Sequence, residues 1–99
     1  MILESIIKEV ENATHPVAKA LHKGEHFKVL AISFKKGMVL KEHMAHLPTR
    51  LFVLQGSIIY KEESRSVTLH ALEDIEIPVE VLHSVDALED SLCLLTQGK

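Results

Sequence analysis

The sequence predicts one all-β domain, a sandwich or barrel, preceded by a short amphipathic helix. From residue 17 onward, short apolar, β-branched segments recur every eight to ten residues between turn signals, a pattern typical of sandwiches and barrels. The residues before them carry apolar side chains at helical spacing, which predicts a helix. With 99 residues, 46% of them hydrophobic, the chain suits a single domain over 1–99 with a modest core.

The amino-terminal helix is expected within residues 1–13. Its apolar face consists of Ile2, Leu3, Ile6, Ile7 and Val10, with charged residues on the other side, so the helix should dock on the rest of the chain. The His15-Pro16 pair then ends the helical segment, because the residue before a proline disfavours the helical conformation.

Nine strands are expected after the helix, with Gly24, Gly37 and Gly56 at three of the joints. They lie near 17–22, 26–35, 38–43, 49–55, 57–62, 65–70, 74–77, 82–87 and 91–96. Both faces of the segment 26–35 are rather apolar. We therefore expect this strand to be buried on its two sides.

Composition excludes several classes of function. The formal net charge is −3 and no basic run exceeds Lys35-Lys36, so neither nucleic acid nor an anionic membrane surface is an expected partner. No apolar run approaches the roughly 18 residues of a membrane span, and the amino terminus lacks a signal-peptide pattern. Cys93 is the only cysteine; it excludes an internal disulfide, fits a cytoplasmic protein, and is expected to be a buried, inert thiol.

The seven histidines divide into two groups. Four stand beside turns or among charged residues and are expected to be solvated: His15, His22, His26 and His70. The other three, His43, His46 and His83, each follow an apolar strand-like segment close to a proline-containing bend. If the fold brings these three together they can bind a first-row metal, which requires several imidazole or carboxylate ligands. The alternative is that they are hydrogen-bonded polar groups without a metal.

Residues 37–56 resemble the first motif of the cupin family. In that motif a glycine, a histidine pair, a glutamate and a second glycine follow one another at set intervals. Gly37, His43 and Gly56 stand at these intervals, whereas Ala45 and Thr49 occupy the positions of the second histidine and the glutamate.

Residues 72–87 resemble the second cupin motif. Pro78 and His83 are correctly five residues apart. Leu72, Glu80 and Ala87 replace the glycine, the glycine and the asparagine of that motif. The residues around His43 and the stretch 83–91 also resemble a subgroup of very small bacterial cupins.

The resemblance implies a double-stranded β-helix, or jelly-roll barrel, in which the two motifs face each other and their histidines bind a metal. Of the four ligand positions in the family, His43 and His83 are retained. His46 is one residue from the vacant Ala45 position and is the third candidate ligand. The metal would be a divalent ion such as Zn, Fe, Mn or Ni. Two retained ligands are few for such an ion, so a pocket without a tightly bound metal stays open as the alternative.

Strand alternation extends the pocket from Thr49. If this side chain points inward, Leu51, Val53 and Gln55 share its face. A mostly apolar wall with a few polar groups suits a small, mostly apolar ligand. Phe52 and Leu54 then face outward and need cover from the amino-terminal helix or a second subunit, so a homodimer is expected.

Three functions follow from these observations. The first is a small-molecule-binding module of unassigned activity, with its pocket inside the barrel. The second is a metal-dependent enzyme of dioxygenase or isomerase type acting on a small metabolite, and the third is an interaction domain whose interior is only core. A nucleophilic relay through His83, Ser84 and Asp86 is not expected, because adjacent strand residues face opposite sides.

Overall fold

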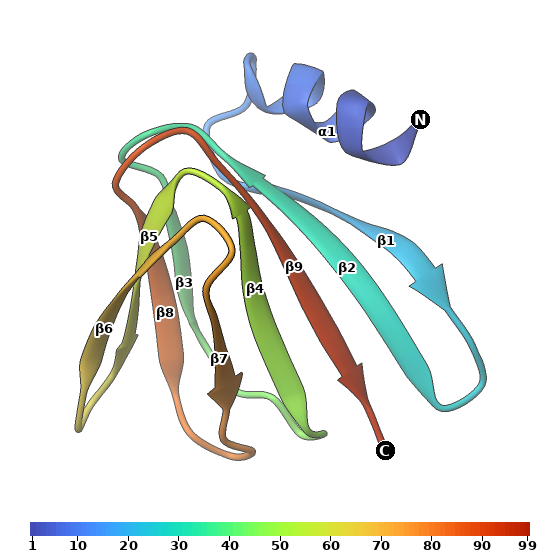
Figure 1. Cartoon of the computed structure of the whole chain (residues 1–99), viewed down its shortest axis with the longest axis vertical. Coiled ribbons are helices and arrows are strands. Elements are labelled where there is room, and N and C mark those ends of the chain that lie inside the picture. The colour runs from blue at the N-terminus through green and yellow to red at the C-terminus, as the bar shows by residue number, and fades with distance from the viewer.

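The computed structural model describes residues 1–99 and contains one helix followed by nine strands (Figure 1). The helix α1 spans Ile2–Val10. The strands are β1 (Val17–Lys23), β2 (Phe27–Phe34), β3 (Val39–His43), β4 (Thr49–Gln55), β5 (Ser57–Glu62), β6 (Ser66–His70), β7 (Asp74–Ile77), β8 (His83–Ala87) and β9 (Ser91–Gly98). Every predicted strand is present, with its ends within two residues of the prediction.

Two antiparallel sheets face each other across the core. The larger sheet has the strand order β1-β2-β9-β4-β7, and the smaller has the order β3-β8-β5-β6. Strands that are neighbours in a sheet are mostly far apart in the sequence, as in β2 with β9 and β3 with β8. This arrangement is a jelly-roll barrel, and it confirms the predicted fold class.

The interior of the larger sheet is built in rows that run across β2, β9 and β4. From the deep end to the open end, the rows are Ile32–Cys93–Val53, Leu30–Leu95–Leu51 and Lys28–Gln97–Thr49. The first two rows are apolar and the last is polar. Cys93 is fully buried, and burial raises the pKa of its thiol to about 12, as expected for an inert cysteine.

The helix α1 lies on the outer face of the larger sheet, across one end of β1 and β2 (Figure 1). Ile6 and Val10 are buried there against Val17, Ala31 and Leu92, which confirms the expected docking of the helix. At nine residues, α1 falls short of a membrane-spanning helix, and the chain contains no other helix that could serve.

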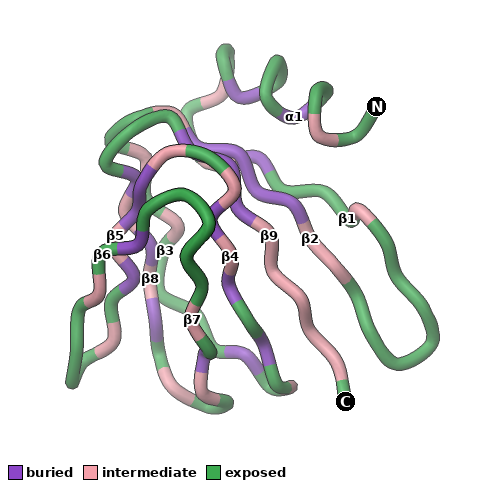
Figure 2. Tube along the Cα trace, in the orientation of Figure 1, coloured by how far each residue is buried: buried purple, intermediate pink, exposed green.

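The burial of β2 corrects one expectation. Only its second half is buried on both faces, whereas Phe27 and Lys28 at its start are exposed (Figure 2). Phe27 is exposed because α1 covers only one end of the outer face, and Lys28 is exposed because it lies on the inner face at the open end of the barrel. Leu54 packs against the cluster under α1, so the helix supplies the cover expected for it. The homodimer stays a prediction, because the structure contains one chain.

Two turns of the second motif keep a glycine-like backbone without glycine. Leu72 has φ +74° and Glu80 has φ +61°. Both lie in the left-handed region, which costs an L-residue roughly 1–2 kcal/mol. These are two of the positions at which the cupin motif has glycine. Both turns therefore use a backbone conformation that glycine adopts at no steric cost.

Candidate functional site

The two histidines retained from the cupin motifs meet at the open end of the barrel. His43 ends β3, His83 begins β8, and the two residues are directly paired in the smaller sheet. Their Nε2 atoms are 3.1 Å apart and their ring centroids 4.2 Å apart. The register of β3 against β8 shifts between Leu40 and His43.

The hydrogen bonds of the outer ring nitrogens fix the role of the inner ones. Nδ1 of His43 lies 2.8 Å from the Lys41 carbonyl oxygen, and Nδ1 of His83 lies 3.1 Å from that of Val81. A carbonyl oxygen only accepts, so both Nδ1 atoms carry the hydrogen. In a neutral pair both Nε2 atoms are then acceptors that face each other. Such a pair accepts a hydrogen bond from a ligand or shares one proton.

The surroundings of His83 favour its neutral form. His83 is 2% exposed, whereas His43 is exposed at the mouth of the barrel. Burial is the largest cause that lowers the pKa of His83, and the neighbouring His43 lowers it further; the Val81 carbonyl and Glu62 oppose the shift. A neutral His83 leaves its Nε2 lone pair directed toward His43 and the cavity.

His46 does not join this pair. Its Nδ1 donates to the carboxylate of Glu80 at 2.9 Å on the exposed rim. Among residues 1–99, no group of three or more His, Cys, Asp or Glu side chains is arranged to hold a metal ion. The three-histidine ligand set is therefore not assembled. Zinc sites have three or four protein ligands, so the residues present do not fit a tightly bound divalent metal.

A cavity of about 430 Å³ opens beside the histidine pair. Its lining consists of Lys28, Leu30, His43, Met44, Ala45, His46, Leu47, Thr49, His83, Leu95 and Gln97. The amide of Gln97 donates to Thr49 Oγ1 at 3.1 Å, and Thr49 Oγ1 donates to the Leu47 carbonyl at 2.9 Å. The polar row Lys28–Gln97–Thr49 thus forms one wall, and the row beneath supplies Leu30 and Leu95 as an apolar floor.

Of the four pocket residues expected from alternation, only Thr49 lines this cavity. Leu51 and Val53 lie in the packed core. Gln55 is exposed and lines a separate small cavity beside Ile7 and Ser91. The assignment of Gln55 to the inward pocket face is wrong, because the pairing of β4 with β9 shifts register between Val53 and Gln55.

Sequence reasoning missed Lys28, Leu30, Leu95 and Gln97. Alternation in 26–35 does place Lys28 and Leu30 on one face. Nothing local, however, indicates that β9 lies between β2 and β4. These residues could be found only from the strand order, because it pairs positions almost seventy residues apart, as in Lys28 with Gln97.

An ionic cluster lies behind His83, with Tyr60 fully buried, Glu62 partly buried and Arg65 exposed. The Tyr60 hydroxyl donates to Glu62 Oε2 at 2.5 Å, and Arg65 donates to both Glu62 oxygens at 2.9 and 3.0 Å. The rings of Tyr60 and His83 are 5.7 Å apart, and Glu62 is the cross-strand partner of His83. The Arg65 hydrogen bonds, together with that of Tyr60, lower the pKa of the Glu62 carboxyl below its ordinary value.

We expect the Glu62 ion pair to make stability depend on pH. A carboxyl whose pKa is lowered in the folded state contributes stability above its unfolded pKa, about 4.3, and loses it as the pH falls through the folded value. In Arg65→Gln this contribution shrinks, so the unfolding free energy of the wild type should fall more steeply than that of the variant below about pH 5. Urea unfolding between pH 7 and pH 3 measures the difference.

Lys61→Gln is the matched control, since it removes an equal charge from the exposed Lys61–Asp86 pair. Parallel pH profiles for Arg65→Gln and the wild type would contradict the role given to Glu62.

Comparisons with known proteins place the fold. No protein-family model matches the sequence, and no curated protein matches it. Solved structures do match. A cupin superfamily protein from Desulfitobacterium hafniense is 16% identical with a TM-score of 0.81, over 88% of this chain and 80% of that one. An RmlC-like cupin from Desulfovibrio desulfuricans is 23% identical with a TM-score of 0.78, over 85% and 82%. A cupin 2 conserved barrel domain protein from Leptotrichia buccalis is 25% identical with a TM-score of 0.80, over 89% and 43%.

Proposed function

Because this chain has the cupin fold, we propose that it binds a small molecule in the cavity at the open end of its barrel. The observation that carries the proposal is the pairing of a cavity of about 430 Å³ with two imidazoles whose Nε2 atoms are 3.1 Å apart beside it. Ligand sites are typically cavities of roughly 300–1,000 Å³ that combine apolar walls with a few convergent polar groups.

The lining indicates the chemistry of the ligand. Leu30, Leu47 and Leu95 offer apolar contact, so part of the ligand is hydrocarbon. The histidine pair presents two acceptor nitrogens, so the ligand carries an O–H or N–H group that donates to them. The interaction-only alternative would require an interior filled by packed side chains, and a cavity of this size favours binding.

The metal-dependent enzyme is the weaker alternative. It requires a third ligand beside His43 and His83, and His46 is instead bound to Glu80. We therefore propose no reaction step that uses a metal.

A thermal-shift screen against a collection of small metabolites tests the proposed function. A ligand at one hundred times its Kd should add about 2.7 kcal/mol to the unfolding free energy, which raises the Tm of a domain of this size by roughly 10–20 °C. In His43→Ala most of this rise should disappear, because one acceptor of the pair is lost. His70→Ala is the control, since His70 is exposed on β6 and lines none of the cavities described above.

Two results would contradict the proposal. One is a screen in which ligand-dependent shifts are equal in the wild type and His43→Ala. The other is purified protein that retains one equivalent of divalent metal, lost in His43→Ala, which would favour the metal-dependent enzyme.

A further inference from the structure

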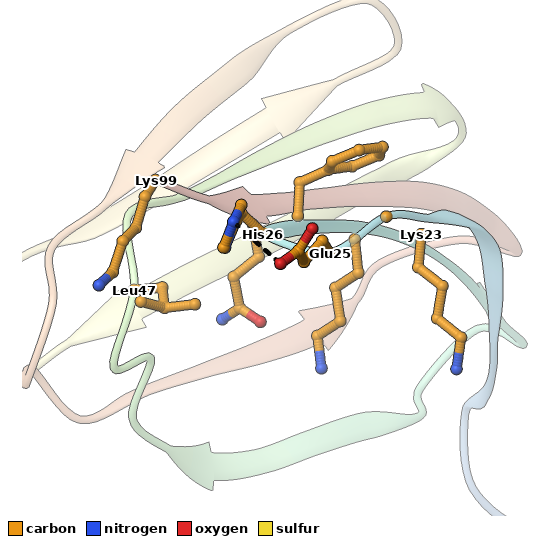
Figure 3. A pocket seen from close by; sticks show the side chains of 9 residues that line it. Lys23, Glu25, His26, Leu47 and Lys99 are labelled. Atoms are coloured by element: carbon orange, nitrogen blue, oxygen red, sulfur yellow. Dashed lines mark ion pairs between the residues drawn. The ribbon is translucent and has the colours of Figure 1, made fainter.

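A second cavity adjoins the first and is bordered by cations. It has a volume of about 360 Å³ and is lined by Lys23, Gly24, Glu25, His26, Phe27, Lys28, Leu47, Gln97 and Lys99 (Figure 3). Lys28, Leu47 and Gln97 line both cavities. The two cavities are therefore neighbours, and the second lies beside the tip of the β1–β2 hairpin.

The lysines of this second cavity have no ionic partners. None of Lys23, Lys28 and Lys99 takes part in an ion pair. The one carboxylate side chain in the lining, that of Glu25, lies 3.6 Å from the imidazole of His26. The long side chains of Lys23 and Lys99 extend to the same side of the ribbon in Figure 3.

Two of these lysines face each other across the hairpin. Lys23 of β1 and Lys28 of β2 are direct cross-strand partners. Like charges in this position destabilise a strand pair, and neither lysine forms an ion pair with a carboxylate of the protein. Yet the whole chain is acidic, with 14 Asp and Glu against 11 Lys and Arg. An anion between the two ammonium groups would relieve the repulsion.

From this geometry we infer that the ligand is an amphiphilic anion whose carboxylate or phosphate binds between Lys23 and Lys28. Its hydrocarbon part lies over Leu30, Leu47 and Leu95, and its far end donates a hydrogen bond to the histidine pair. The inference rests on the proposed function and adds the charge and the orientation of the ligand. Lys28 lines both cavities. It belongs to the row Lys28–Gln97–Thr49 beside the histidine pair, and it is one of the three lysines that line the second cavity.

The test uses three probes that share a six-carbon chain with a terminal hydroxyl as the donor: 6-hydroxyhexanoate, 6-hydroxyhexyl phosphate and the uncharged 1,6-hexanediol. Each is titrated into isotope-labelled full-length protein, and NMR follows the backbone amides of Gly24 and Lys28 together with the imidazole signals of His43 and His83. We expect at least one anion to shift the hairpin amides saturably and to bind about tenfold more tightly than 1,6-hexanediol, since two exposed charge pairs contribute on this scale. The comparison between 6-hydroxyhexanoate and 6-hydroxyhexyl phosphate distinguishes a carboxylate site from a phosphate site.

The double variant Lys23→Gln, Lys28→Gln should lose about tenfold in affinity for the anion and nothing for 1,6-hexanediol. A higher salt concentration should likewise weaken the binding of the anions but not that of the uncharged probe. Without a probe, Lys23→Gln should be as stable as the wild type or more so, because it removes a cross-strand repulsion. Lys8→Gln, Lys36→Gln is the matched control, since both lysines are exposed, unpaired and remote from the two cavities.

The failure of this inference and that of the proposed function give different results. The inference would be overturned if the three probes bound with equal affinity and if these affinities were the same in the lysine variant. The proposed function would still stand in that case if the probes shifted the imidazole signals. Shifts at Gly24 and Lys28 with silent imidazoles for every probe would keep the anion site and contradict the proposed function. The inference would also be overturned if neither anion shifted the backbone amide signals of Gly24 and Lys28.

Discussion

Replacing Gly56 by alanine should cost roughly 3 kcal/mol or more of unfolding free energy, enough to unfold a large fraction of a marginally stable domain. Gly56 is the single residue between β4 and β5, where the chain passes from one sheet to the other. An added Cβ would collide with the Asp90 carbonyl oxygen and Ser91 Oγ, and would lie 2.9 Å from Ser91 Cα. Because two of these three atoms are backbone, no rotamer change relieves the overlap.

Ser91 cannot move away at low cost either. Its hydroxyl lies 3.1 Å from the Ser57 carbonyl oxygen and 2.8 Å from that of Glu89, and it accepts from the Ser57 amide at 3.1 Å. Displacement of β9 at this point would leave buried polar groups without partners. The clash therefore adds to the cost of the positive φ, +84°.

Gly37→Ala separates the two costs. Gly37 has nearly the same φ, +88°, but an added Cβ there meets nothing within 4 Å. We expect Gly37→Ala to lose only the unfolding free energy that an L-residue costs in the left-handed conformation, roughly 1–2 kcal/mol. Urea unfolding followed by circular dichroism measures both variants. If Gly56→Ala and Gly37→Ala lost the same unfolding free energy, the close packing of Gly56 against β9 would not be the reason that glycine is required there.

The second large effect is expected at Ile6 in α1. Its side chain is 0% exposed and packs with Val17, Ala31 and Leu92 of three different strands. Truncation to alanine leaves a cavity where the helix meets the sheet, at a cost of roughly 2–4 kcal/mol. Alanine is at least as good a helix former as isoleucine, so the loss reports on packing alone.

Ile7→Ala is the control for this substitution. The neighbouring side chain is 38% exposed, so the same change should cost less than about 1 kcal/mol. Thermal unfolding of the two variants gives the comparison. If both lose the same small amount, α1 is only loosely attached and the outer face of the sheet does not depend on it.

Most of the fold was predictable because its elements are locally encoded. Alternation and turn residues mark the nine strands, and the 3.6-residue spacing marks α1. The meeting of His43 with His83 followed from the resemblance of two separate motifs, each with its own spacing. No single segment contains the information that these two positions are paired across β3 and β8.

The errors arose where the local rule gives way to the tertiary arrangement. Alternation along β4 holds from Thr49 to Val53 and then fails at Gln55, because the register shifts at that point. His46 was assigned to a vacant ligand position by its distance along the sequence. Sequence spacing says nothing about Glu80, whose carboxylate draws His46 to the rim.

The left-handed residues Leu72 and Glu80 have a consequence for the order in which the barrel forms. A turn whose residues disfavour its own conformation is a poor starting point for the pairing of the strands on either side of it. The loops around 72 and 80 should therefore close late, after β4 and β9 have aligned, and their amides should exchange with solvent earlier than those of the flanking strands. In this chain the paired strands on either side therefore stabilise the conformation of both turns.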